Sequence, residues 1–141
     1  MKICIASDHG GFDLKAHLIE YLKKQDYTVS DLGCNNKDSV DYPVYGSLVG
    51  QSITQGEFDY GILICGTGIG ISIAANRYPS VRAALCYDVT TARLCREHND
   101  ANVLALGARQ TASELAEEIV NMFLSTEFEG GRHQRRIDLL S

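Results

Sequence analysis

The clearest chemistry in this sequence lies where a cysteine ends an uncharged, strand-like run and a glycine-rich turn follows at once. The run covers residues 61–64, the cysteine is Cys65, and glycines occupy three of the five positions 66–70. Such a turn lets backbone N–H groups converge on an anion, and a following helix adds its positive end. The same field favours the thiolate form of a neighbouring cysteine. The segment therefore predicts a base or nucleophile beside an anion-binding turn.

A simpler interpretation treats Cys65 as a small buried side chain at the end of a strand, since free cysteines are often fully buried. The adjoining glycines favour the functional interpretation. Three familiar motifs nevertheless fail here. A dinucleotide-binding fingerprint starting at Gly66 needs a third glycine where Ile71 stands, although Asp88 imitates its ribose-binding acid. A P-loop needs Gly-Lys-Ser/Thr after the glycines, and a cysteine phosphatase needs arginine at position 71.

The bulk composition is that of an ordinary α/β protein. The 141 residues predict one domain, 1–141, and the net charge of -5 argues against nucleic acid or an anionic membrane as partner. The five cysteines are odd in number and contain no C-x-x-C pair, which fits neither a disulfide framework nor a zinc knuckle. We see no signal peptide or membrane span, and expect a cytoplasmic protein.

Strand-like and helix-period runs alternate along the chain, which predicts a three-layer αβα, Rossmann-like domain with five parallel strands. Expected strands cover residues 2–6, 28–32, 61–65, 82–86 and 103–106. Expected helices lie between them: 12–22, a helix opened by Pro43, about 70–77, 88–98 and 111–124. Thr111 with Glu114 forms a capping-box pattern at the start of the last of these. A short basic tail follows Gly130-Gly131.

Other polar groups gather in the loops, each with a structural alternative. Asp8, in the segment 7–11 after the first strand, also suits a helix cap. His98 lies near a helix C-terminus, where it would complement the helix dipole. Arg132 and Arg136 are four residues apart and share one helix face, as a phosphate clamp or as an exposed basic surface.

These segments together resemble the B-type ribose-5-phosphate isomerases, which belong with the galactose-6-phosphate isomerase subunits in one superfamily. The likeness covers essentially the whole chain. The His98-Asn99 pair and the Gly-Gly-Arg-His tail favour the ribose-5-phosphate branch, while allose-6-phosphate isomerases share much of the pattern. The matching segments are SDHGG at 7–11, DYP at 41–43, CGTGIGISIAANR at 65–77, REHNDANVLALG at 96–107 and EGGRHQRR at 129–136.

The resemblance implies an aldose–ketose isomerase that works through a cis-enediolate. Cys65 would be the base that moves a proton between C2 and C1. The Thr67 hydroxyl would stabilise the enediolate together with backbone amides of the turn. The turn residues that bind substrate in this way would be Gly66, Gly68, Ile69 and Gly70. His98 would open the furanose ring with Asp8 opposite. The resemblance gives substrate hydroxyls to Tyr42 and Asn99, and the phosphate to His9, Arg109, Arg132 and Arg136.

The resemblance also implies that no metal or organic cofactor is needed, and that the protein is a homodimer or homotetramer with sites built from two chains. Two other functional classes stay open. One is a nucleotide- or flavin-binding module that uses the same turn, which a ligand-binding scan would reveal. The other is a sugar-phosphate sensor without catalysis, which binding without turnover would identify. Cys86 and Cys95 match no motif and receive no role.

Overall fold

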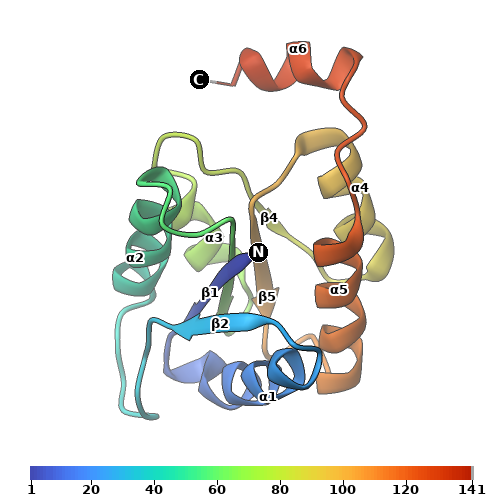
Figure 1. Ribbon diagram of the computed structural model, residues 1–141. Coiled ribbons are helices and arrows are strands. Elements are labelled where there is room, and N and C mark those ends of the chain that lie inside the picture. The colour runs from blue at the N-terminus through green and yellow to red at the C-terminus, as the bar shows by residue number, and fades with distance from the viewer. Residues whose placement is uncertain (141) are drawn as a thin grey trace.

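A five-stranded, wholly parallel sheet forms the centre of the molecule (Figure 1), in the order β2-β1-β3-β5-β4. The computed structural model describes residues 1–140. The sheet confirms the predicted α/β class and the five parallel strands. Its strands are β1 (Lys2–Ser7), β2 (Thr28–Asp31), β3 (Tyr60–Cys65), β4 (Ala83–Leu85) and β5 (Val103–Gly107).

Helices cover both faces of the sheet and complete the three layers. One face carries α1 (Phe12–Lys24), α4 (Val89–Asn99) and α5 (Ser113–Ser125). The other carries α2 (Tyr42–Thr54) and α3 (Ile69–Ala75). A single 3-10 turn, His9–Gly11, joins β1 to α1, and α6 (Arg132–Asp138) ends the described chain.

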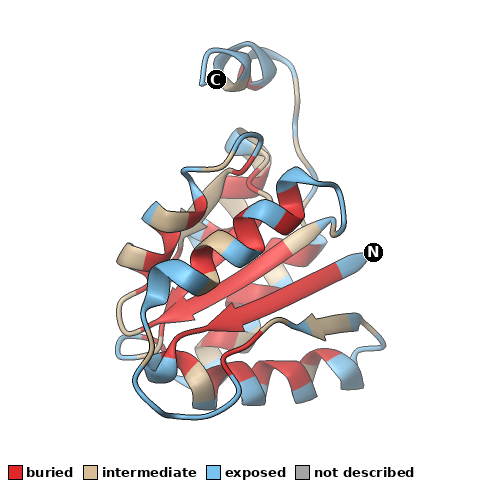
Figure 2. Ribbon diagram, turned by 90° about the vertical axis from the view of Figure 1, so that its left-hand side faces the viewer, coloured by how far each residue is buried: buried red, intermediate tan, exposed pale blue. Residues whose placement is uncertain are grey.

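The hydrophobic core is split in two by the sheet, because successive strand side chains point to opposite faces. Ile3 and Ile5 pack with Phe123 on the α1/α5 side, while Cys4 packs with Val49 on the α2/α3 side. Figure 2 shows β1 buried along nearly its whole length. Strands covered on both faces are expected to be continuous apolar runs, which is how they look in the sequence.

The order of the strands produces a topological switch point between β1 and β3, the position at which open α/β sheets bind ligands. From β1 the chain first moves outward to β2, and then returns to place β3 on the other side of β1. The loops that follow β1 and β3 therefore lead to helices on opposite faces of the sheet, α1 and α3. The loop after β3 is the glycine turn at positions 66–70.

The capping-box prediction is wrong. The α5 helix begins at Ser113, its N-cap is Ala112, and no side chain caps it. The hydroxyl of Thr111 is instead turned into the protein, where it is buried without a hydrogen-bond partner among the described residues. Local sequence favoured Thr111 as the N-cap, but its hydroxyl is buried, and the N-cap lies one residue later in the chain.

The α6 helix stands beyond the main body, next to the end of α4 (Figure 1). Gly130 and Gly131 precede it with positive φ angles of 68° and 59°, so the chain turns sharply there. His133 is the buried residue of α6, at 5% exposure. No helix within residues 1–140 is long and apolar enough to span a membrane.

Candidate active site

Cys65 ends β3 and lies inside the glycine turn. Its side chain is 5% exposed, and the backbone N–H of Gly68 donates a hydrogen bond to its sulfur at 3.1 Å. Gly68 has a φ of 79°, and a Cβ there would lie 2.5 Å from Leu85 Cδ1. Only glycine fits this combination of backbone angle and space. The turn therefore holds the thiol against its own amides.

The turn is fixed from two sides. The Thr67 hydroxyl accepts a hydrogen bond from the N–H of Ile69 at 3.2 Å. The Tyr87 hydroxyl, on the loop after β4, donates to the Thr67 carbonyl at 2.7 Å. Tyr87 was not predicted as a site residue, because nothing in its local sequence indicates this contact. These bonds hold the Thr67 side chain and the helix start in place without a ligand.

The loop after β1 brings a carboxylate next to this turn. Asp8 is 8% exposed and accepts a hydrogen bond from Gly11 N–H at 3.1 Å, so it does cap the short 3-10 turn. A Cβ on Gly10 would lie 3.3 Å from Asp8 Oδ1 and 3.6 Å from Gly66 N. Asp8 can therefore cap the short turn and also belong to the candidate site, since it lies beside the glycine turn.

Basic and aromatic groups complete this part of the site. Arg109 passes over the turn: a Cβ on Gly66 would lie 3.3 Å from its Nε. The Tyr42 ring covers Gly70, where a Cβ would lie 2.6 Å from ring carbons. His9 follows Asp8 in the 3-10 turn, and its Nδ1 accepts a hydrogen bond from Val40 N–H at 3.1 Å. We call the residues of the two loops, with Tyr42 and Arg109, the thiol cluster: Asp8, His9, Tyr42, Cys65, Gly66, Thr67, Gly68, Ile69, Gly70 and Arg109.

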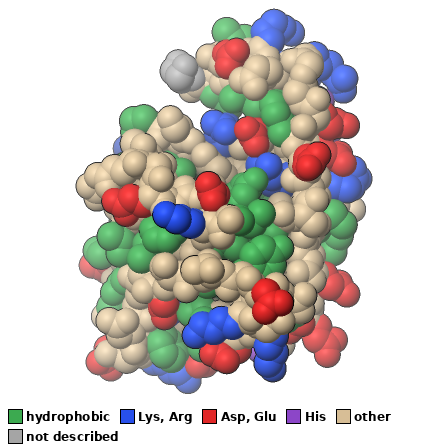
Figure 3. Space-filling view, in the orientation of Figure 1, with side chains coloured by type: hydrophobic (Ala, Val, Ile, Leu, Met, Phe, Trp, Pro, Cys, Tyr) green, Lys and Arg blue, Asp and Glu red, His purple; other side chains and the backbone are tan. Residues whose placement is uncertain are grey.

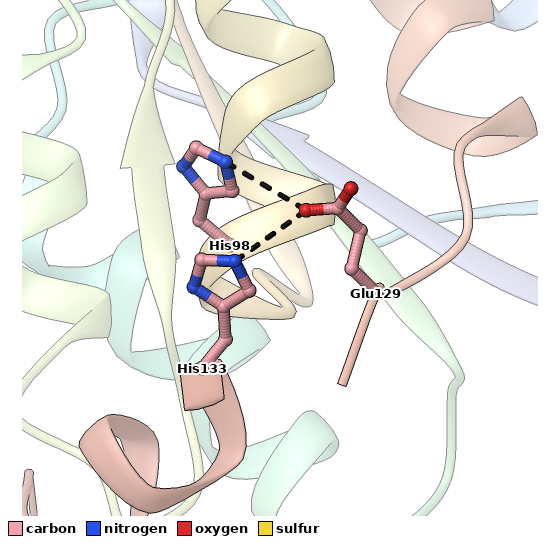
Figure 4. Close-up of side chains that lie close together, drawn as sticks. All are labelled: His98, Glu129 and His133. Atoms are coloured by element: carbon pink, nitrogen blue, oxygen red, sulfur yellow. Dashed lines mark ion pairs between the residues drawn. The ribbon is translucent and has the colours of Figure 1, made fainter. Parts of the chain in front are cut away.

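A second cluster forms where the tail returns to the end of α4 (Figure 4). The rings of His98 and His133 stack with centroids 4.5 Å apart and planes at 18°. Their Nε2 atoms lie 3.8 Å and 3.4 Å, respectively, from the same oxygen of Glu129. Together with neighbouring residues they form the histidine cluster, with a cavity of about 350 Å³ along it. Its members are His98, Asn99, Glu129, Arg132, His133 and Arg136.

A buried arginine positions the end of α4 that carries His98. Arg96 is 4% exposed and donates hydrogen bonds to Ala101 O at 2.6 Å and to Tyr60 Oη at 3.0 Å. It also donates to Thr126 O at 3.1 Å, at the C-cap of α5. Arg96 thus joins α4, β3 and the end of α5, and its role in the 96–107 segment is structural.

Within one chain the two clusters lie at opposite ends of the sheet. Cys65 pairs with Gly107 at the carboxyl end of β5, whereas His98 precedes Val103 at the amino end. Val103 and Gly107 are four steps apart along β5, so about 13 Å of extended strand separates these ends. Blue side chains at the top of Figure 3 mark the basic α6 region, beyond the main body. The predicted site residues are therefore brought together in two groups, not one.

The sequence did not reveal that Glu129 and His133 contact His98. Glu129 and His133 are four residues apart in the segment 129–136, which resembles the isomerases. That resemblance was the available indication that they belong to a site. Asp88, which imitated a ribose-binding acid, instead caps α4 by accepting a hydrogen bond from Thr91 N–H at 2.7 Å. That bond lowers the pKa of the Asp88 carboxyl. Asp88 thus has a structural role that explains its position after β4.

A parallel α/β domain that joins a thiol, a carboxylate and an arginine at the crevice of its sheet has the layout of an enzyme for a small anionic metabolite. The Ribose/Galactose Isomerase family matches residues 3–140. The chain belongs to this family.

Relatives with solved structures share the whole fold. Ribose-5-phosphate isomerase B of Clostridium thermocellum is 52% identical, with a TM-score of 0.98 over 99% of this chain and 95% of that one. The Mycoplasma genitalium ribose-5-phosphate isomerase B, solved with bound ribulose-5-phosphate, is 47% identical, with a TM-score of 0.95 over 99% and 93%. The Escherichia coli (strain K12) ribose-5-phosphate isomerase B is 46% identical over 99% of this chain and 94% of its own length.

Proposed function

We propose that this protein interconverts ribose 5-phosphate and ribulose 5-phosphate. Family membership and the similarity to a relative that holds ribulose-5-phosphate support an aldose–ketose isomerase. The observation that carries the proposal is the Cys65 sulfur, hydrogen-bonded within the glycine turn and flanked by Asp8 and Arg109. This arrangement offers a base and an anion-binding surface at one point.

The central step is a proton transfer between neighbouring carbons. The Cys65 thiolate removes the proton from C2 of the open-chain aldose, and the electron pair forms the C1–C2 double bond while O1 becomes negative. A proton moves from O2 to O1, and Cys65 returns its proton to C1. Amides of the turn and the Thr67 hydroxyl stabilise the enediolate oxygens, as donors aimed at developing charge do.

Ring opening needs separate proton transfers, because the furanose has no free carbonyl. We assign them to His98, which would deliver or remove the proton on the ring oxygen, with Asp8 on the opposite side. Tyr42 and Asn99 bind sugar hydroxyls. His9, Arg109, Arg132 and Arg136 hold the phosphate, since guanidinium groups match its geometry.

This assignment requires two chains, because Cys65 and His98 lie at opposite ends of the sheet in one chain. We propose a dimer in which the histidine cluster of each chain completes the thiol cluster of its partner, alone or within a tetramer. The surface of α2 and α3 beside the thiol cluster supports this. It exposes apolar side chains that suit an interface: Tyr42, Val44, Leu48, Ile69 and Ile73.

Steady-state assays with ribose 5-phosphate, allose 6-phosphate and galactose 6-phosphate test the function. We expect the highest kcat/KM with ribose 5-phosphate. Cys65→Ala should lower kcat by about a hundredfold to ten-thousandfold, the usual effect of losing a general base, while a substrate analogue still binds.

The matched control is Cys4→Ala, which removes a thiol sulfur from β1, the strand next to β3. Burial raises the pKa of Cys4 to about 12, so this thiol stays protonated and its loss should leave kcat near the wild-type value. Near-normal turnover by Cys65→Ala would contradict the proposal. A preference for a six-carbon substrate would move the protein to another branch of the family.

A further inference from the structure

The histidine cluster contains three groups that ligate transition metals. The Nε2 atoms of His98 and His133 and an oxygen of Glu129 lie within 4.8 Å of one another. Figure 4 shows both imidazole rings facing the same carboxylate oxygen. The groups come from α4, from the segment before Gly130 and from α6, so the return of the tail assembles them.

A buried nitrogen in this cluster lacks a partner. His133 is 5% exposed, and its Nε2 has no hydrogen-bond partner among the described residues. Its 3.4 Å contact with Glu129 is an ion-pair distance without hydrogen-bond geometry. Buried polar atoms are nearly always satisfied, so this nitrogen indicates room for another atom. The His98 and Glu129 side chains are 41% and 53% exposed, which leaves an entry path and space for water ligands.

We infer that His98, Glu129 and His133 form a binding site for a divalent transition metal of the zinc type. Two imidazoles and one carboxylate, with a position left for water, are a known zinc ligand set. Ligand atoms about 2.1 Å from a tetrahedral ion lie about 3.4 Å from each other. The His133–Glu129 pair already has this separation, and the His98–Glu129 pair, at 3.8 Å, is about 0.4 Å longer. The two histidine Nε2 atoms lie within 4.8 Å of each other on stacked rings whose planes differ by 18°. The exposed His98 ring must therefore turn out of the stack before both lone pairs, which lie in the ring planes, reach one ion.

The ion would act as an inhibitor rather than as part of the catalytic machinery. This part rests on the proposed function, in which His98 moves the proton of ring opening, because a metal on Nε2 occupies that nitrogen. Arg132 and Arg136 line the same cavity, and their positive charges oppose any cation. We therefore expect reversible binding that EDTA removes, not a permanent structural ion.

Titration of the EDTA-treated, full-length protein with Co²⁺ tests the site directly through visible absorption. We expect the intense bands of a tetrahedral complex with one ion per chain. Glu129→Gln and His133→Asn should each weaken binding at least tenfold, an effect of the size seen when a ligand is lost. Glu129 is exposed, so its variant keeps the test valid even if His133→Asn fails to fold.

His17→Asn is the matched control, because His17 Nε2 lies 2.6 Å from Glu117 Oε2 in an ordinary surface pair. It should bind Co²⁺ as the wild type does. Absence of binding, or a sulfur-to-cobalt charge-transfer band that places the ion on a cysteine, would overturn the inference whether or not the protein is an isomerase. Zn²⁺ should also inhibit turnover by the wild type more strongly than turnover by Glu129→Gln. Binding without inhibition would overturn the inhibitory role.

Discussion

The cysteine side chains differ in their surroundings, and therefore in how readily each thiol can lose its proton. All five cysteines are buried and unpaired by disulfides. Cys86 and Cys95 lie with sulfurs 4.0 Å apart, and their shared hydrogen bond together with burial raises the pKa of Cys95. Burial likewise keeps Cys4 protonated, with a pKa of about 12. Cys65 is the thiol whose sulfur accepts a hydrogen bond from the glycine turn, through Gly68 N–H.

Iodoacetamide should therefore inactivate the enzyme in step with alkylation of Cys65, and ribose 5-phosphate should slow both. The physical reason is that the substrate covers the sulfur inside the turn. Peptide mapping by mass spectrometry at neutral pH measures the modification at each cysteine. Cys4 should remain unmodified, since its protonated thiol is a poor nucleophile. Loss of activity with Cys65 unmodified would argue against its role.

Substitution of His98 should separate the two steps of the reaction, ring opening and the proton transfer between C2 and C1. His98→Asn should lower kcat with ribose 5-phosphate by about a hundredfold or more, because the ring oxygen loses its proton donor. Erythrose 4-phosphate lacks the hydroxyl needed to close a furanose ring. Deuterium exchange at its C2, followed by NMR, should change much less. His17→Asn serves as the control, and equal losses in both reactions would give His98 a different role.

At the scale of elements, the glycine turn was predictable because its position after a buried strand fixes it at the sheet edge. Local rules failed at Thr111, where burial of the hydroxyl outweighed the capping pattern. They were also silent on Glu129 and His133. Their contacts with His98 depend on the path of the chain through Gly130-Gly131, which no local propensity specifies.

Gly68→Ala tests the turn, with Gly56→Ala as its control. Both glycines have positive φ angles, 79° and 74°, so both substitutions strain the backbone by about 1–2 kcal/mol. The added Cβ meets nothing within 4 Å at Gly56, but lies 2.5 Å from Leu85 and 2.8 Å from the Leu106 carbonyl carbon at Gly68.

Urea unfolding should therefore show a greater loss of stability for Gly68→Ala, and kcat should fall with it as the turn shifts. Gly56→Ala should keep its kcat. Equal stability losses with unchanged activity in both variants would mean that the turn tolerates a side chain.

The α6 helix should contribute phosphate binding through one of its faces. Arg136→Ala should raise KM for ribose 5-phosphate about tenfold to a hundredfold, because a charge-assisted hydrogen bond is worth about 1.5–3 kcal/mol. Arg135 is exposed on the same helix and does not line the cavity, so Arg135→Ala is the matched control. Steady-state kinetics and inhibition by inorganic phosphate measure the effect. Similar changes in both variants would indicate a general charge effect instead.

For the whole molecule, the main consequence of the fold is the distance between the two clusters. Local sequence and the family resemblance together indicated most residues of both clusters, but not Glu129 and His133. The resemblance also implied that two chains share a site. The strand directions explain why: the 96–100 segment precedes its strand, while residues 7–11 and 66–70 follow theirs. A compact domain with short strands cannot bring opposite sheet ends together, and this separation is the reason we propose that a second chain completes the site.

Complementation between two inactive variants tests this shared site most directly. Cys65→Ala would be unfolded and refolded together with a chain that carries Arg132→Ala and Arg136→Ala, and ribose 5-phosphate turnover measured. Half of randomly paired dimers are mixed, and each mixed dimer has one intact site and one doubly damaged site, so we predict about a quarter of wild-type activity. Each variant refolded alone should show almost no turnover at ribose 5-phosphate concentrations below the wild-type KM, where the raised KM of the arginine variant suppresses its activity. Mixed dimers confirmed by mass spectrometry but without recovered activity would contradict the account, because each chain would then complete its own site.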